Sequence, residues 1–239
     1  MKPQIITLSE RDDLYAFAAD WLAEVSDEII AKSGRFTIAL SGGSTPAGWY
    51  DHLVLRDEIK WSYFDFFWSD ERFVPIDHQE SNAGLAVRRL LQPLGIEKEH
   101  YFPVPTQYPT AHQAAMEYES LIRGFFGVLE TVPRFDLILL GLGSDGHTAS
   151  LFPNGKALLE NRRLVTADFV EKLSSWRITF TLPLLNQAKN IAFIISGEEK
   201  AETVRRLLKE QDPTLPALQV RPTNGRLFFL LDVAAASRL

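Results

Sequence analysis

The segment FDLILLGLGSDGHTASLFP, residues 135–153, joins the most continuous apolar run of the chain to a glycine-rich loop. An apolar run of this kind is typical of a central parallel strand that is buried on both faces. Gly141, Gly143 and Gly146 follow it with the G-x-G-x-x-G spacing of a dinucleotide-binding turn. Asp168 lies about 20 residues further on, where a ribose-binding acid would be expected. The segment therefore predicts a ligand-binding loop, for a nicotinamide cofactor or for another purpose.

Three features of this loop weaken the dinucleotide interpretation. The fingerprint needs its last glycine to begin a long helix whose N-terminus holds the pyrophosphate. Here about one or two helical turns fit before Pro153 and Asn154 break the pattern. The charged Asp145 would face the pyrophosphate, and the motif lies past the midpoint of the chain rather than in a first βαβ unit. A hydride-transfer enzyme is therefore the minor hypothesis.

Outward from this strand, short β-type runs alternate with amphipathic helices. The expected strands lie at residues 4–8, 36–40, 63–68, 101–104, 135–140, 164–167, 178–182, 191–195 and 227–231. The expected helices follow Ser9 as an N-cap and stop at Gly34, open at Thr45 and Pro46, and cover residues near 81–91, about 110–126 and 198–208. This alternation predicts an α/β fold with an open, doubly wound, mostly parallel sheet and helices on both faces, a Rossmann-like arrangement. We expect one domain over residues 1–239.

The composition excludes several classes of function. The chain has 239 residues, 46% of them hydrophobic and 23% charged, and a formal net charge of −6, which argues against a nucleic-acid binder. It has no cysteine, so disulfides, thiolate metal sites and cysteine nucleophiles are excluded. No apolar stretch approaches the roughly 18 residues of a membrane span. The N-terminal MKPQIITLSERDD lacks the apolar core of a signal peptide. We expect a cytoplasmic enzyme that acts on a small molecule, without a membrane or nucleic-acid partner.

Three polar stretches follow predicted strands, where ligands bind in such sheets. The first is LSGGSTP, residues 40–46, in which Gly42 and Gly43 let the backbone turn its N–H groups toward a ligand. Ser44 and Thr45 add hydroxyl groups, and the N-terminus of the following helix favours negative charge. The spacing of a Walker A loop is missing, so ATP is not implied. A phosphate is the favoured ligand, and a plain strand-to-helix turn is the alternative.

The second stretch is WSDERFVP, residues 68–75. A charged triplet such as Asp70–Arg72 is most often a solvated turn. The functional interpretation makes Arg72 an electrostatic clamp and Asp70 either its orienting partner or a base.

The third stretch is the loop quoted above, and it contains His147 two residues after Asp145. A loop at the end of a buried strand would present this histidine to the ligand crevice, and Asp145 is near enough to fix its orientation or tautomer. We also expect Gly143 to contact the ligand. A lone histidine is more often structural, which is the alternative here.

Two basic residues later in the chain have open roles. Arg177 lies in the expected strand RITFTLP and is either solvent-facing or directed at a ligand. Lys200 lies in the first turn of a helix, where the helix dipole disfavours a cation. Glu198 and Glu199 would neutralise it in one interpretation. In the other, Lys200 and Arg177 share a bound anion.

Together, the segments SGGSTP, SDERFVP, GLGSDGHTASLFP and RITFTLPLLNQAKNIAFIISGEEKA, in that order, resemble the 6-phosphogluconolactonases of the glucosamine-6-phosphate isomerase/6-phosphogluconolactonase superfamily. The resemblance extends from about residue 36 to residue 201 and is most specific in the third segment. It implies hydrolysis of 6-phospho-D-glucono-1,5-lactone to 6-phosphogluconate in the oxidative pentose phosphate pathway. It implies neither a metal nor a nucleotide cofactor.

The resemblance also implies roles for individual residues. His147 would be the general base that activates water, Asp145 would orient it, and Arg72 would stabilise negative charge in the pocket. The substrate phosphate would be held by a turn and two cations, namely Gly43, Ser44, Thr45, Arg177 and Lys200. A lactone is an activated ester, so water activated by a histidine suffices and no covalent nucleophile is needed.

Two alternatives remain beside the lactonase. Glucosamine-6-phosphate deaminases resemble the chain in the D-G-H turn, but they usually continue with an IAFNEP-like segment that bears a functional Glu. Residues 148–153 read TASLFP and lack that acid, and Asp-Glu-Arg at residues 70–72 departs from the deaminases' usual Asp-Glu-Tyr. A non-catalytic sugar-phosphate sensor is the other alternative, and retention of Asp145 and His147 beside a phosphate loop argues against it.

Overall fold

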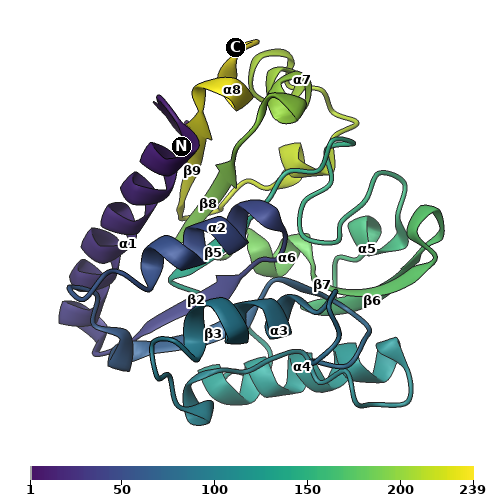
Figure 1. The fold of residues 1–239 in the computed structure, drawn as a ribbon. Coiled ribbons are helices and arrows are strands. Elements are labelled where there is room, and N and C mark those ends of the chain that lie inside the picture. The colour runs from purple at the N-terminus through teal and green to yellow at the C-terminus, as the bar shows by residue number, and fades with distance from the viewer. Residues whose placement is uncertain (1) are drawn as a thin grey trace.

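A six-stranded sheet forms the centre of the computed structural model, which describes residues 2–239 (Figure 1). The strand order is β1-β9-β8-β5-β2-β3, and every neighbouring pair runs parallel. These strands are β1 (Gln4–Leu8), β2 (Phe36–Leu40), β3 (Phe64–Trp68), β5 (Leu137–Leu140), β8 (Asn190–Ile195) and β9 (Arg226–Asp232). The quoted apolar run supplies β5 in the interior of the sheet, and all of its residues are buried. The predicted α/β class with a mostly parallel sheet is confirmed.

Eight α-helices accompany the strands within residues 2–239. They are α1 (Arg11–Ser33), α2 (Ser44–Leu53), α3 (Asn82–Ala86), α4 (Ala111–Phe126), α5 (Lys156–Leu159), α6 (Leu182–Leu185), α7 (Ala201–Arg205) and α8 (Val233–Ala236). The apolar stripe of α1 packs against β9, where Trp21 meets Phe228 at 4.9 Å between ring centroids. Among the described residues, no helix combines the length and the apolar character needed to span a bilayer.

The ends of two helices differ from the predicted ends. Glu10, not Ser9, is the N-cap residue of α1, and its side chain makes no capping hydrogen bond. Gly34 ends α1 as predicted, with φ of 73° and its N–H donating to Ile30 O. Helix α2 begins two residues early, at Ser44 instead of Pro46, because Gly43 with φ of 106° turns the chain and takes the N-cap position expected for Thr45.

The second difference from the prediction is a small antiparallel sheet of order β4-β7-β6. Its strands are β4 (Asp70–Arg72), β6 (Val165–Val170) and β7 (Ser175–Phe180), and α4 packs against the last two. Three charged residues carry no strand signal, and β4 forms because β7 supplies its hydrogen-bond partners. The strand expected at 101–104 is reduced to a single bridge between Tyr101 and Phe66.

Candidate active site

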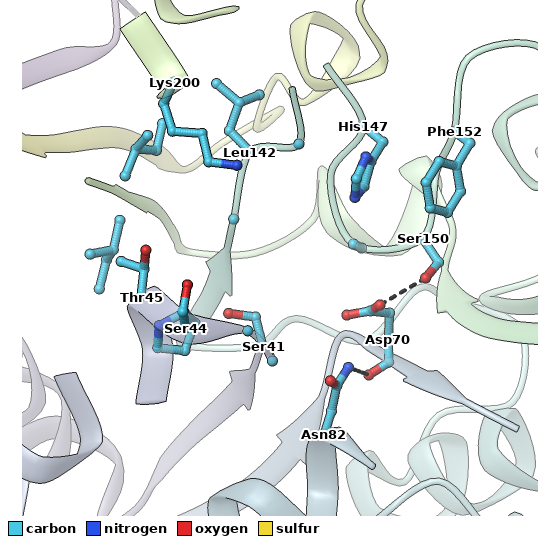
Figure 2. Close-up of a pocket in the computed structure, with 18 of the residues that line it drawn as sticks. Ser41, Ser44, Thr45, Asp70, Asn82, Leu142, His147, Ser150, Phe152 and Lys200 are labelled. Carbon is cyan, nitrogen blue, oxygen red and sulfur yellow. Dashed lines mark hydrogen bonds between the residues drawn. The ribbon is translucent and has the colours of Figure 1, made fainter. Parts of the chain in front are cut away.

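A cavity of about 410 Å³ opens where the loops after β2, β5 and β8 meet β4 and β7. Figure 2 shows that Lys200, Ser44 and Thr45 occupy one side of it, and His147 and Asp70 the other. The structure brings almost all of the sequence-predicted site residues to its lining, namely Gly42, Gly43, Ser44, Thr45, Asp70, Arg72, Gly143, His147, Arg177 and Lys200. Asp145 is not among the lining residues, and it contacts His147. Segments that are distant in sequence therefore form one site.

His147 and Asp145 form a hydrogen-bonded pair at the end of β5. The Nδ1 atom of His147 lies 2.5 Å from Oδ1 of Asp145, and the backbone N–H of His147 donates to the same oxygen at 3.1 Å. A carboxylate at Nδ1 favours the tautomer with the proton there. The lone pair then lies on Nε2, the ring nitrogen that a base would use.

Phe152 and Lys172 complete the surroundings of this pair. The Phe152 ring stacks on the imidazole at 4.2 Å between centroids (Figure 2). The Lys172 ammonium donates a hydrogen bond to Oδ2 of Asp145. Burial raises the pKa of the Asp145 carboxyl, but the hydrogen bonds from Lys172 and His147 outweigh it and hold that pKa below its usual range. The carboxylate therefore stays ionised at neutral pH.

Replacing Asp145 by asparagine is expected to lower the free energy of unfolding at neutral pH, by an amount that shrinks in acid. Folding lowers the pKa of this carboxyl below its unfolded value of about 4. The stabilisation is therefore complete above that value and is lost as the pH falls through the folded pKa. Denaturant unfolding of both proteins between about pH 7 and about pH 3 measures the difference. A difference independent of pH would contradict the expectation.

Two glycines of the loop leave room for neighbouring side chains, and for Gly143 that side chain is His147. A Cβ on Gly143 would lie 2.0 Å from Nδ1 of His147, so the imidazole occupies the space that a side chain would need. The Gly143 N–H donates to His147 O at 2.9 Å, so this amide is engaged within the loop. Gly146 has φ of 81°, and a Cβ there would meet Leu215 at 2.5 Å. Asp168 accepts a hydrogen bond from the Ala157 N–H and does not line the cavity.

Arg72 and Arg177 lie opposite each other in the antiparallel sheet. Arg177 is only 8% exposed, so its solvent-facing alternative is wrong. Both Nε atoms are buried, and neither has a hydrogen-bond partner among residues 2–239. Burial and the neighbouring Arg72 charge lower the pKa of Arg177. Two facing guanidinium groups with unused donors are suited to an anion.

One interpretation of the sequence made Asp70 the residue that orients Arg72, and the structure contradicts it. Within residues 2–239 no hydrogen bond or ion pair joins the two side chains. Instead Oδ2 of Asp70 accepts from Ser150 Oγ at 2.7 Å, and Asn82 donates to its carbonyl oxygen at 3.0 Å. The other carboxylate oxygen is turned toward the cavity (Figure 2).

Glu71 shows why the charged triplet is not a solvated turn. It is 1% exposed, and its carboxylate accepts four hydrogen bonds, from Ser81 Oγ and from the N–H groups of Arg72, Asn82 and Ala83. Burial raises the pKa of Glu71 despite these donors. Glu71 thereby fixes the start of α3 against β4.

The glycine–serine–threonine turn and Lys200 form the other side of the cavity. The turn opens α2, and Thr45 Oγ1 lies 3.3 Å from Ser196 Oγ at the end of β8. Lys200 follows Gly197 in a short 3-10 turn. Among residues 2–239 neither Glu198 nor Glu199 forms an ion pair with it, so the neutralised alternative is not realised.

Comparison with known proteins places these features in one family. Residues 9–229 match the family of glucosamine-6-phosphate isomerases and 6-phosphogluconolactonases. The chain belongs to this family. It is 39% identical over 242 residues to a 6-phosphogluconolactonase of Synechocystis, with 100% of this chain and 99% of the relative covered. A 6-phosphogluconolactonase of Rattus norvegicus is 36% identical, with 98% and 93% covered.

Solved structures give the same result for the fold. The 6-phosphogluconolactonase of Trypanosoma cruzi aligns with a TM-score of 0.88 and 30% identity, covering 100% of this chain and 97% of that one. A monomeric glucosamine-6-phosphate deaminase aligns with a TM-score of 0.82 at 21% identity, covering 99% and 100%. The second likeness concerns the fold alone.

Four contributors to the site carry little or no signal in the sequence. Phe152 and Ser150 belong to the quoted segment, and the only signal for them was that they follow His147 closely in the sequence. Asn82 and Lys172 come from other segments, and no local pattern marks them.

Proposed function

We propose that the protein hydrolyses 6-phospho-D-glucono-1,5-lactone to 6-phosphogluconate, a step of the oxidative pentose phosphate pathway. The observation that carries the proposal is the His147–Asp145 pair in the same cavity as Arg72, Arg177 and Lys200. Full-length similarity to 6-phosphogluconolactonases supports it. A charged sugar phosphate does not cross a membrane unaided, so the enzyme must share a compartment with its substrate, and we propose that this compartment is the cytoplasm.

His147 acts as the general base in the proposed mechanism. Nε2 removes a proton from water as the water oxygen forms a bond to the lactone carbonyl carbon. Asp145, ionised and bound to Nδ1, stabilises the imidazolium that results. When the tetrahedral intermediate collapses, the bond between that carbon and the ring oxygen breaks. The imidazolium then returns the proton to the leaving ring oxygen.

Cations and backbone donors hold the negatively charged parts of the substrate. The Gly43–Thr45 turn at the N-terminus of α2, with Arg177 and Lys200, binds the phosphate. Arg72, directly across from Arg177, stabilises negative charge in the same cavity. Asp70 accepts a hydrogen bond from a sugar hydroxyl through its free oxygen. Phosphate binding remote from the carbonyl positions the lactone for attack.

The lactonase is favoured over the deaminase by the residues after His147. The loop continues through Ala149, with φ of 46°, to Phe152 on the imidazole, and residues 148–153 contain no acid. The test is hydrolysis of freshly prepared lactone by purified protein without added metal, measured against spontaneous opening. A rate equal to the blank, together with conversion of glucosamine 6-phosphate, would establish the deaminase instead. Binding without either reaction would establish the sensor.

Removing Lys200 is expected to weaken binding of the phosphorylated substrate selectively. A charge-assisted hydrogen bond contributes about 1.5–3 kcal/mol, so Lys200→Ala should raise KM about tenfold or more with a smaller change in kcat. Turnover of unphosphorylated gluconolactone should change little. Lys98→Ala, at an exposed lysine away from the cavity, is the control. Equal KM values for Lys200→Ala and the control would return Lys200 to a structural role.

A further inference from the structure

Lys172 stands outside the functions assigned above, yet it contacts both groups that hold the catalytic histidine. Its ammonium donates to Asp145 Oδ2, while Asp145 Oδ1 accepts from His147. It also lies 4.6 Å from the centroid of the Phe152 ring, which stacks on the imidazole. Lys172, Asp145, His147 and Phe152 therefore form a closed ring of contacts.

Lys172 comes from a different segment of the chain than the three residues it is linked to. It lies in the 3-10 turn Glu171–Leu173 that joins β6 to β7, and Asp145 is 27 residues earlier. Ser174 with φ of 45° closes this turn, and its N–H donates to Glu171 O at 3.0 Å. Leu173 lines the cavity beside it. The tip of the β6–β7 hairpin therefore contacts the loop that carries His147.

A solvent-exposed ion pair alone contributes little to stability. The side chain of Lys172 is 54% exposed and that of Asp145 29% exposed, so their attraction is partly screened. The importance of the contact lies in geometry, because a carboxylate with one oxygen fixed by Lys172 has one oxygen left for His147. Without the ammonium, Asp145 is held only at Oδ1, by the backbone N–H and the ring of His147, so its carboxylate can turn about that oxygen and the direction of the imidazole is less fixed. The cation over Phe152 also holds the ring against which the imidazole packs.

We propose that Lys172 is a positioning residue for the proposed hydrolysis. It fixes Asp145 and Phe152, and through them the Nε2 atom of His147, and it makes the β6–β7 hairpin part of the catalytic apparatus. The inference rests on the proposed function for its kinetic consequence. Its structural part, the fixed His147–Asp145 hydrogen bond, stands on the contacts alone.

Three variants test this role by kinetics. Lys172→Met keeps an unbranched side chain that is one heavy atom shorter, and it removes the charge. The kcat should then fall about tenfold, below the hundredfold that a misplacement of about 1 Å can cost. KM should stay within about twofold of wild type, since no group that binds the substrate is removed. Lys172→Arg should restore most of the rate. Lys98→Met makes the same change of net charge at an exposed lysine and should leave both constants unchanged.

Coupling to Asp145 distinguishes positioning from a general structural effect. In an Asp145→Asn background, Lys172→Met should produce little further loss of kcat. Additive losses, or a normal kcat for Lys172→Met alone, would overturn the proposal.

Proton NMR of the His147 Nδ1–H gives a measurement that does not require turnover. Its low-field signal should shift or broaden in Lys172→Met and persist in Lys172→Arg and Lys98→Met. If the wild type had no lactonase activity but showed this pattern, the proposed function would fail and the positioning of His147 by Lys172 would stand. An unchanged signal in Lys172→Met would overturn the positioning itself.

Discussion

His147→Asn is expected to lower kcat for the phosphorylated lactone by about 10²–10⁴-fold, the contribution typical of a general base. Asparagine fills much of the same space and can still meet Asp145, but it offers no basic nitrogen where Nε2 stands. Water would then attack without proton removal. Steady-state kinetics with freshly prepared lactone, corrected for spontaneous opening, measures the effect.

Binding should survive this substitution, because three of the proposed phosphate contacts, Ser44, Thr45 and Lys200, lie on the opposite side of the cavity from His147 (Figure 2). We expect 6-phosphogluconate to bind His147→Asn within a few-fold of its wild-type affinity in calorimetry. His100→Asn is a matched control, since His100 also pairs with an aspartate, Asp65, at 3.1 Å but does not line the cavity. Wild-type turnover by His147→Asn would remove His147 from the mechanism.

The parts of the fold that sequence could predict are those whose signal is local. The continuous apolar run at β5 and the alternation of strands with helices lead directly to a parallel sheet, and its rules place the following loops at one edge. The sequence alone therefore predicts that the three polar stretches lie together at that edge. The helix stop at Gly34 is local in the same sense, because the αL conformation favours glycine.

The second sheet could not be predicted because its reason is not local. The triplet Asp70–Arg72 becomes a strand only through pairing with β7, which lies about a hundred residues later. The same pairing buries Arg177, whose sequence pattern fits a solvent-facing residue equally well. Glu71 likewise gains its role from four donors that the sequence does not place beside it.

Within the loop that carries His147, the sequence suggests the residues of the site but not the cause of their spacing. The glycine pattern alone fits a pyrophosphate-binding turn, and only the folded arrangement of the side chains shows what fills the space beside Gly143.

Gly143→Ala is expected to lower kcat on the order of a hundredfold, the cost of displacing a catalytic group by about 1 Å. The added Cβ would lie 2.0 Å from Nδ1 and 2.2 Å from Cε1 of His147, and 2.8 Å from Oδ1 of Asp145. These distances are far below van der Waals contact, so the imidazole or the loop must move. Gly124→Ala on α4 is the control and should keep wild-type kinetics, because beyond its own helix turn no atom of residues 2–239 lies within 4 Å of the new Cβ.

A double-mutant cycle identifies the imidazole as the group that Gly143 accommodates. The His147→Ala substitution removes both ring atoms that the new Cβ would meet most closely, so that of the three nearest atoms the Asp145 oxygen remains. Gly143→Ala should therefore reduce the free energy of unfolding less in the His147→Ala background than in the wild type. Equal losses in both backgrounds would mean that the glycine serves the backbone and not the ring. A smaller loss without the ring would show why this loop carries a dinucleotide-like glycine spacing: the glycine leaves room for a base, where a dinucleotide fold would leave room for a pyrophosphate.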